Sequence, residues 1–131
     1  MHKQILYALI LVSVSMGFAN AQQYSLYDAK NSKEGKPVLK GQPYMWFGQA
    51  KQGKKSINAT GSHDFTGSQK QTCIYAALDA LVELKKDATK KKYAIIQDIH
   101  SPGARPGFFN CNFSGSSATV KLYGNLSQPG R

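Results

Sequence analysis

The sequence is poor in acidic residues, with 7 Asp and Glu against 17 Lys and Arg among 131 residues, and its formal net charge is +10. Such an imbalance predicts attraction to anionic partners, namely nucleic acid, lipopolysaccharide, anionic phospholipid or acidic glycan, without choosing among them. The lysines are spread along the chain, so a solvated surface that only keeps the protein in solution is an equal alternative.

Long hydrophobic runs are also scarce. The apolar residues 5–18 are too few for a membrane span, and together with Lys3 and the small-residue site at residues 19–21 they are typical of an export signal. We expect a signal peptide at residues 1–21, followed by a single domain at residues 22–131 in the periplasm or outside the cell. No cysteine follows the cleavage site, so we expect no bacterial lipid anchor. Without residues 1–21, the chain has 16 basic and 7 acidic residues and therefore a formal charge of +9.

One amphipathic helix is predicted from about residue 69 to residue 91. Ser68 and Gln71 are spaced as in a capping box, in which two side chains satisfy backbone donors at a helix start. The apolar side chains recur with the helical period: Ile74, Ala77, Leu78, Leu81, Leu84 and Ala88. Two oppositely charged pairs are expected on the polar face: Glu83 with Lys86, and Asp87 with Lys90.

Alternation of apolar and polar residues predicts three strands after the helix: residues 93–99, 109–113 and 118–124. Upstream, we expect strands at residues 24–27 and 44–48, separated by a mobile loop at residues 28–43. Strands with one apolar and one polar face suit an antiparallel sheet that is wet on one side. The predicted fold is therefore α+β, a small, mainly antiparallel sheet of about four to five strands with one amphipathic helix packed on one face.

Cys73 and Cys111 are the only cysteines. An even count in an exported chain indicates a disulfide, and both residues lie on the apolar sides of their predicted elements. The alternative is a thiol nucleophile assisted by His63 or His100, but nothing near either cysteine in the sequence supplies that arrangement.

Residues 48–56 come close to a phosphate-binding loop. That motif needs Ser or Thr directly after Gly-Lys to hold magnesium, whereas Lys55 occupies the position and Ser56 follows one residue late. No strand–loop–helix pattern surrounds the segment. We therefore interpret it as a basic loop and expect no nucleotide and no cofactor.

Two short His/carboxylate neighbourhoods are candidate chemical sites: His63 with Asp64, and Asp98 with His100. Together they could hold zinc, but no ligand spacing requires it, and we expect no metal. Asp98 and His100 share one side of a predicted strand, so a solvated or hydrogen-bonded pair is the simpler interpretation. A small hydrolase using these two residues is a weaker hypothesis.

Residues in the helix and the last strands form a pattern that is also found in other proteins: Cys73, Ala76, Ala80, Leu81, Leu84, Ala94, Ile95, Ile96, Ile99, Ser101, Phe109, Cys111, Ala118, Val120, Leu122 and Gly124. In this pattern the chain resembles a family of small exported bacterial proteins that carry the description "excinuclease ATPase subunit". It is more distantly similar to the envelope-stress lipoprotein of the Rcs phosphorelay. The resemblance implies an α+β domain with a helix–strand disulfide. The family has Gly-Asn-Ala where this chain has Lys92, Tyr93 and Ala94, so the glycine that usually caps the helix is missing.

These observations predict a non-enzymatic, monomeric envelope or secreted protein that binds an anionic surface or a protein partner. The alternative is a secreted cationic effector or a nucleic-acid or glycan binder that also uses Trp46 or nearby tyrosines. The predicted anion-binding residues are Lys51, Lys54, Lys55, Lys90, Lys91 and Lys92.

Overall fold

The structure, a computed structural model, describes residues 21–51 and 53–129; the predicted signal peptide, up to residue 20, lies outside them. A sheet of six strands and one long helix make up most of this part of the chain, which confirms the α+β class. The elements are β1 (Ala21–Ser25), α2 (Leu26–Lys30), α3 (Gly35–Leu39), β2 (Tyr44–Phe47), β3 (Ser56–Asp64), α4 (Gln69–Lys90), β4 (Tyr93–His100), β5 (Phe108–Ser114) and β6 (Ser117–Pro129).

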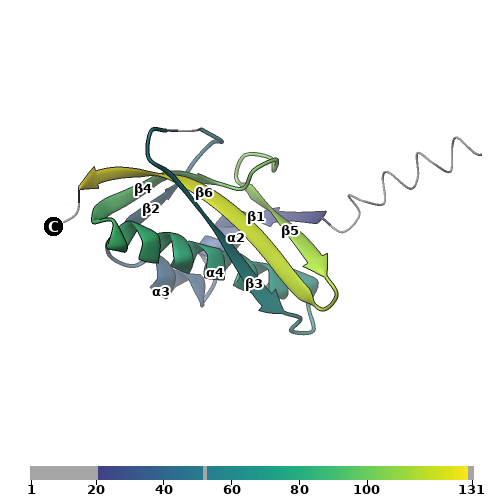
Figure 1. The fold of residues 1–131 in the computed structure, drawn as a ribbon. Coiled ribbons are helices and arrows are strands. Elements are labelled where there is room, and N and C mark those ends of the chain that lie inside the picture. The colour runs from purple at the N-terminus through teal and green to yellow at the C-terminus, as the bar shows by residue number, and fades with distance from the viewer. Residues whose placement is uncertain (1–20, 52, 130–131) are drawn as a thin grey trace, which may run out of the picture.

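The sheet is organised around the long strand β6 (Figure 1). β3 pairs with residues 117–125 of β6, whereas β5 pairs with residues 117–119 and β4 with residues 123–129. Because β3 overlaps both of the others, β4 and β5 share the opposite edge of β6 in succession. β1 then extends β5, and β2 extends β4 as the single parallel pair, so the sheet is mainly antiparallel.

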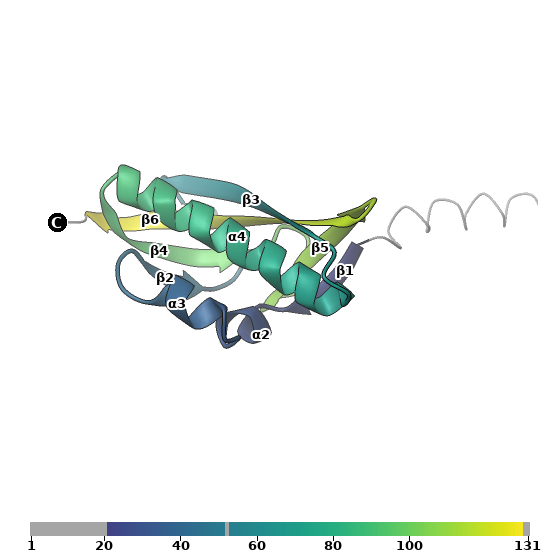
Figure 2. The ribbon, with the colours of Figure 1, turned by 90° about the horizontal axis from the view of Figure 1, so that it is seen from below.

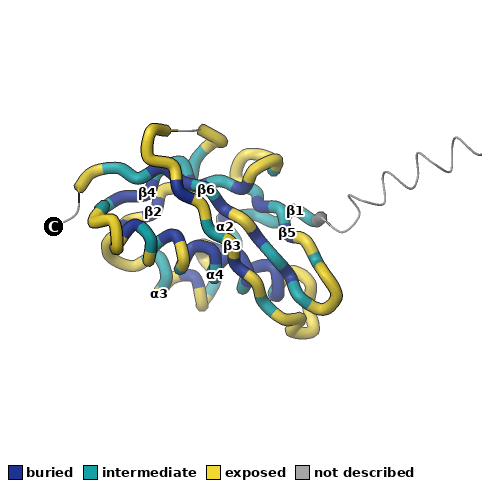
Figure 3. The backbone as a smooth tube through the Cα atoms, in the orientation of Figure 1, coloured by how far each residue is buried: buried dark blue, intermediate teal, exposed yellow. Residues whose placement is uncertain are grey.

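The helix α4 lies across one face of this sheet (Figure 2) and buries its apolar stripe there. All six side chains predicted for that stripe are buried: Ile74, Ala77, Leu78, Leu81, Leu84 and Ala88. The Ser68 side chain accepts the Gln71 N–H at 3.2 Å, which confirms the predicted helix start. The buried residues thus gather between α4 and the sheet, and buried positions alternate with more exposed ones along β3 and β6 (Figure 3).

Gly61 on β3 allows the helix to approach the sheet closely. A Cβ at this position would stand 2.1 Å from the Ala76 carbonyl oxygen and 2.3 Å from the Ala80 nitrogen, both in the α4 backbone. The smallest residue therefore sets the distance between the two layers here. The sequence did not predict β3. Among the side chains of this strand that face the core, only Ile57 is large and aliphatic, so the strand has no clear hydrophobic alternation.

The disulfide between Cys73 and Cys111 is confirmed, with an Sγ–Sγ distance of 2.03 Å. Both cysteines are fully buried, one on α4 and the other on β5. The bond ties the helix to the sheet across the core. It also rules out the alternative of a catalytic thiol, since both sulfurs are consumed.

The predicted strand at residues 24–27 is wrong at its end, because the chain turns into a helix at Leu26. The Ser25 hydroxyl accepts the Tyr27 N–H at 3.0 Å and so caps α2. Leu26 and Ala29 then pack into the core beside α4. The strand β1 instead occupies the residues before this cap.

The mobile loop predicted at residues 28–43 is also wrong, because this segment contains the end of α2 and all of α3. Helices of five residues are too short to show a hydrophobic period, and they depend on tertiary contacts. Lys85 of α4 supplies such contacts: its Nζ donates hydrogen bonds to the carbonyls of Val38 at 2.9 Å and Lys40 at 2.7 Å. Burial lowers the pKa of the Lys85 amine at this joint.

On the polar face of α4, the predicted pair between Glu83 and Lys86 is present at 3.3 Å. The second pair differs from the prediction, because Asp87 pairs with Lys91 at 3.1 Å rather than with Lys90. A spacing of four residues also brings side chains together on a helix.

Lys92 replaces the missing glycine at the helix end. Its φ of 64° lies in the left-handed region, and its N–H donates to the Thr89 carbonyl at 3.0 Å. The turn therefore keeps the geometry of a glycine cap while a lysine bears the conformational cost.

Candidate anion-binding site

The described parts of the loop between β2 and β3, at residues 48–51 and 53–55, border a hollow at one end of the sheet. The hollow has a volume of about 470 Å³. Ile96 and Gly124 face the core, so the lining residues next to them, Gln97 and Asn125, lie on the face away from α4. Three lysines of the loop line the hollow, Lys51, Lys54 and Lys55, together with Tyr93 of β4. Because a strand and not a helix follows the loop, the segment has no phosphate-binding-loop architecture. We call this feature the lysine hollow.

Asn125 of β6 fastens the loop to the sheet. Its Oδ1 accepts the Gly53 N–H at 2.9 Å, and its Nδ2 donates to the Lys51 carbonyl at 2.9 Å and to Asp98 Oδ2 at 3.0 Å. The residue is only 7% exposed because the loop covers it. One side chain thus fixes the backbone that carries the lysines, and a fixed backbone lowers the entropy that binding has to remove.

Asp98 reaches Asn125 because β4 contains a bulge. Ile96 and Ile99 are both fully buried in the core although they stand three residues apart, which a regular strand does not allow. Between Gln97 and His100 the register on β6 shifts by one residue, and Asp98 takes a φ of 54°. The bulge therefore turns the Asp98 carboxylate toward the floor of the lysine hollow.

The lysines of the hollow have no carboxylate partner among the described residues. All four ion pairs in that part of the chain include a residue of α4. Five of the seven acidic residues belong to the helices or to the residue that precedes α3: Asp28, Glu34, Asp79, Glu83 and Asp87. Asp64 lies at the far end of β6 beside Ser117, so Asp98 is the one acidic group in the hollow.

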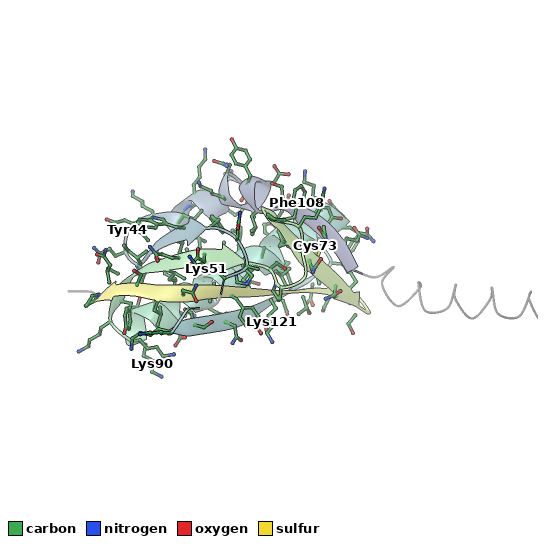
Figure 4. All side chains as sticks on the ribbon, turned by 90° about the horizontal axis from the view of Figure 1, so that it is seen from above. Tyr44, Lys51, Cys73, Lys90, Phe108 and Lys121 are labelled. Atoms are coloured by element: carbon green, nitrogen blue, oxygen red, sulfur yellow. A yellow bond between two sulfur atoms is a disulfide. The ribbon has the colours of Figure 1, made fainter. Side chains whose placement is uncertain are left out.

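Two exposed aromatic residues, Tyr44 and Trp46, lie on β2, next to the strand β4 that supplies part of the lining of the hollow; Figure 4 labels Tyr44 and Lys51. Met45 of β2 is buried in the core, so its neighbours Tyr44 and Trp46 point to the opposite face, away from α4. These two side chains are 45% and 51% exposed. The pairing of β2 with β4 sets Trp46 opposite the bulge at Gln97 and Asp98, which line the hollow.

A second, smaller hollow continues the basic surface along β6. It has a volume of about 170 Å³ and is lined by Lys51 and Ser56 together with His100 and Tyr123, whose rings stack at 5.9 Å. Lys121 lies with its Nζ 5.5 Å from the centre of the Tyr123 ring. The same sheet face thus presents lysines and aromatic rings over two hollows that share Lys51.

The structure brings together only some of the six lysines predicted to bind anions. Lys91 lines a groove next to the lysine hollow, and Lys55 and Tyr93 belong to both. Lys90 faces the helix side, where it lines other grooves. Lys92 lines none of these hollows and serves as the helix cap. Successive helical residues point about 100° apart, so three consecutive lysines do not share one face.

The His/Asp neighbourhoods do not form a common site. His63 lies 3.6 Å from Asp79 and against Tyr75 of α4. The pair of Asp98 and His100 is hydrogen-bonded, but through the Asp98 backbone oxygen, 2.7 Å from His100 Nδ1, and not through the carboxylate. No cluster of three or more His, Cys, Asp or Glu suited to a metal occurs in the residues described.

The prediction from sequence missed Asn125, Gln97 and Tyr123, which line the two hollows. In the sequence, Asn125 follows an alternating strand pattern and has no local signal of its role. Its partners are 72 and 74 positions away in the chain. Only the pairing of β4 with β6 and the course of the loop bring these groups together.

Within the described residues no helix is long and apolar enough to cross a membrane. No protein-family model matches the chain, and searches of curated proteins and of solved structures found no match. The resemblance to the exported bacterial family therefore stays a prediction.

Proposed function

We propose that this protein is a non-enzymatic component of the periplasm or the extracellular space that binds an anionic envelope component through the lysine hollow. The observation that carries this proposal is the set of Lys51, Lys54 and Lys55 on a loop anchored by Asn125, with no carboxylate partner among the residues described. The predicted export signal and the disulfide both fit an oxidising compartment outside the cytoplasm.

Electrostatics favours this hollow over the helix side. Lys70 and Lys86 of α4, and Lys91 directly after it, each pair with a nearby carboxylate, so an incoming anion has to compete with that partner. In the lysine hollow the ammonium groups meet only Asp98, whose carboxylate already accepts a hydrogen bond from Asn125. An anion that enters therefore gains attraction without breaking an ion pair of the protein.

The experiment compares two charge-matched triple variants. Lys51→Gln, Lys54→Gln and Lys55→Gln together remove the charge of the hollow, while Lys30→Gln, Lys33→Gln and Lys36→Gln remove the same charge on and around α2 and α3. Binding of inorganic polyphosphate is measured by calorimetry at low salt. We expect the first triple to weaken binding about tenfold or more and the second to weaken it only a little.

The alternative function is a secreted cationic effector that acts through its overall positive charge, +9 once residues 1–21 are removed. Such a protein has no preferred anion site, so both triple variants would weaken binding equally. Equal losses, with both variants retaining the unfolding temperature of the unchanged protein, would reject the lysine hollow as the binding site.

For a protein partner recognised by shape, binding would be nearly independent of salt, whereas exposed charges are screened within about 10 Å at 0.1 M.

A further inference from the structure

The walls of the lysine hollow carry more than positive charge. Four uncharged polar side chains line it beside the lysines: Gln97, Asn125, Ser127 and Gln128. The Asp98 carboxylate, an acceptor only, belongs to the same lining. A ligand made of phosphate groups alone would offer these acceptors no donor. The lining therefore suits a ligand that alternates anionic groups with neutral hydroxyl groups.

Trp46 adds an apolar surface at the border of the hollow. Its side chain is 51% exposed and stands opposite the bulge residues Gln97 and Asp98 on the neighbouring strand. A large exposed aromatic ring next to polar groups is typical of a contact with a ligand that has a flat apolar face. Tyr44, two residues earlier on the same side of β2, extends this surface along the edge of the sheet.

We propose that the anionic ligand is an acidic polysaccharide, with a sugar ring packed on Trp46 and its acidic groups at Lys51, Lys54 and Lys55. The hydroxyls of the same sugars donate to Asp98 and exchange hydrogen bonds with Gln97 and Ser127. This inference rests on the proposed function, since it names the ligand of the same hollow. A single-stranded DNA would also supply anions and flat rings, but the deoxyribose units between its phosphates carry no free hydroxyl that could donate to Asp98.

The single Trp of the chain makes the test direct, because its fluorescence reports on position 46 alone. Three probes are titrated into the purified protein: polygalacturonate, oligothymidylate and inorganic polyphosphate. We expect polygalacturonate to change the Trp46 emission in a saturable way and to bind most tightly. Polyphosphate is expected to bind through the lysines while leaving the emission unchanged.

Variants separate this inference from the proposed function. Trp46→Ala, followed by calorimetry, is expected to weaken polygalacturonate binding about three- to tenfold and to leave polyphosphate binding unchanged. The matched control is Tyr27→Ala on α2, which removes a ring that is 69% exposed on the helix side. Asp98→Asn is expected to strengthen polyphosphate binding, because it removes a negative charge from the hollow, and to strengthen polygalacturonate binding less, because it also replaces a charged acceptor for sugar hydroxyls with a weaker neutral one.

Each outcome decides one claim. If the lysine triple variant loses polyphosphate while Trp46→Ala keeps full affinity for polygalacturonate, the polysaccharide is rejected and the anion site remains. Tighter, Trp46-dependent binding of oligothymidylate would replace the polysaccharide with a nucleic acid. If none of the three probes binds, the proposed function is overturned together with this inference.

Discussion

The Asn125 Nδ2 atom donates a hydrogen bond of 3.0 Å to Asp98 Oδ2, across 27 positions of the sequence. This contact joins the bulge of β4 to β6, and the same Asn125 side chain holds the loop at Gly53 and Lys51. The arrangement of the lysine hollow thus depends on one uncharged side chain. Loss of that side chain is expected to disturb the site without changing any lysine.

Asn125→Asp tests this dependence with almost no change in shape. The new carboxylate would face Asp98 at hydrogen-bond distance and could no longer donate to Lys51, so the free energy of unfolding is expected to fall by about 1–3 kcal/mol near neutral pH. Repulsion between two carboxylates raises the pKa of one of them, so the loss is expected to shrink as the pH falls and that group is protonated.

The measurement is denaturant unfolding of both proteins between pH 4 and pH 8, with Asn112→Asp on the exposed side of β5 as the control. A difference in stability that stays constant across this range would contradict the contact between the two side chains.

Gly61→Ala is expected to be among the most damaging single-methyl changes in the protein. The added Cβ would lie 2.1 Å from the Ala76 carbonyl oxygen. To relieve this clash, either the α4 backbone or the β3 backbone would have to move, and that movement would disturb the hydrogen bonds of the helix or of the sheet. The expected loss is about 3 kcal/mol or more, measured by urea unfolding. Thr60→Ala, one residue earlier on the exposed side of β3, serves as the control and is expected to cost far less. Equal stability of the two variants would show that the layers are not in close contact there.

Removal of the disulfide is expected to destabilise the protein by about 4 kcal/mol, because Cys73 and Cys111 close a loop with a separation of 38 residues. The double change Cys73→Ala and Cys111→Ala is compared with the oxidised protein by denaturant unfolding. A reducing agent should lower the denaturant concentration at which half of the unchanged protein is unfolded. It should leave the midpoint of the double variant where it was. No effect of the reducing agent on the unchanged protein would contradict a structural role for the bond.

Lys92→Gly is expected to stabilise the protein by about 1 kcal/mol, since glycine adopts the φ of 64° without the strain that a lysine bears. Lys91→Gly is the matched control: Lys91 has a φ of −86°, so the same change there offers no relief and adds chain entropy to the unfolded state. The melting temperatures of the two variants should move in opposite directions. A lower melting temperature for Lys92→Gly would contradict the cap.

The parts of the fold predicted from the sequence have strong local patterns. The α4 stripe repeats large aliphatic residues over several turns, and β5 and β6 alternate clearly between apolar and polar residues. β3 was not predicted, because Gly61 occupies a core position at which a hydrophobic residue would have completed the alternating pattern of a strand. The irregular spacing of Ile96 and Ile99 became interpretable only with the β6 register, which shows the bulge.

The candidate site was predictable only in part, for a similar reason. Lys51, Lys54 and Lys55 are neighbours in sequence and in space because one short loop carries them. Lys90 and Lys92 are also close in sequence, but the helix and its cap send them in different directions. Asn125 and Asp98 become partners through strand pairing, which the composition of either strand leaves undetermined.

The most direct test of the account is to locate the ligand on the protein by NMR. Polygalacturonate is titrated into the 15N-labelled protein, and the backbone amide shifts are followed residue by residue. The account predicts that the largest changes occur at Lys51, Gly53 and Asn125 and at the Trp46 indole, with little change along the exposed side of α4. Changes centred on α4, or spread evenly over the lysines of both faces, would contradict it.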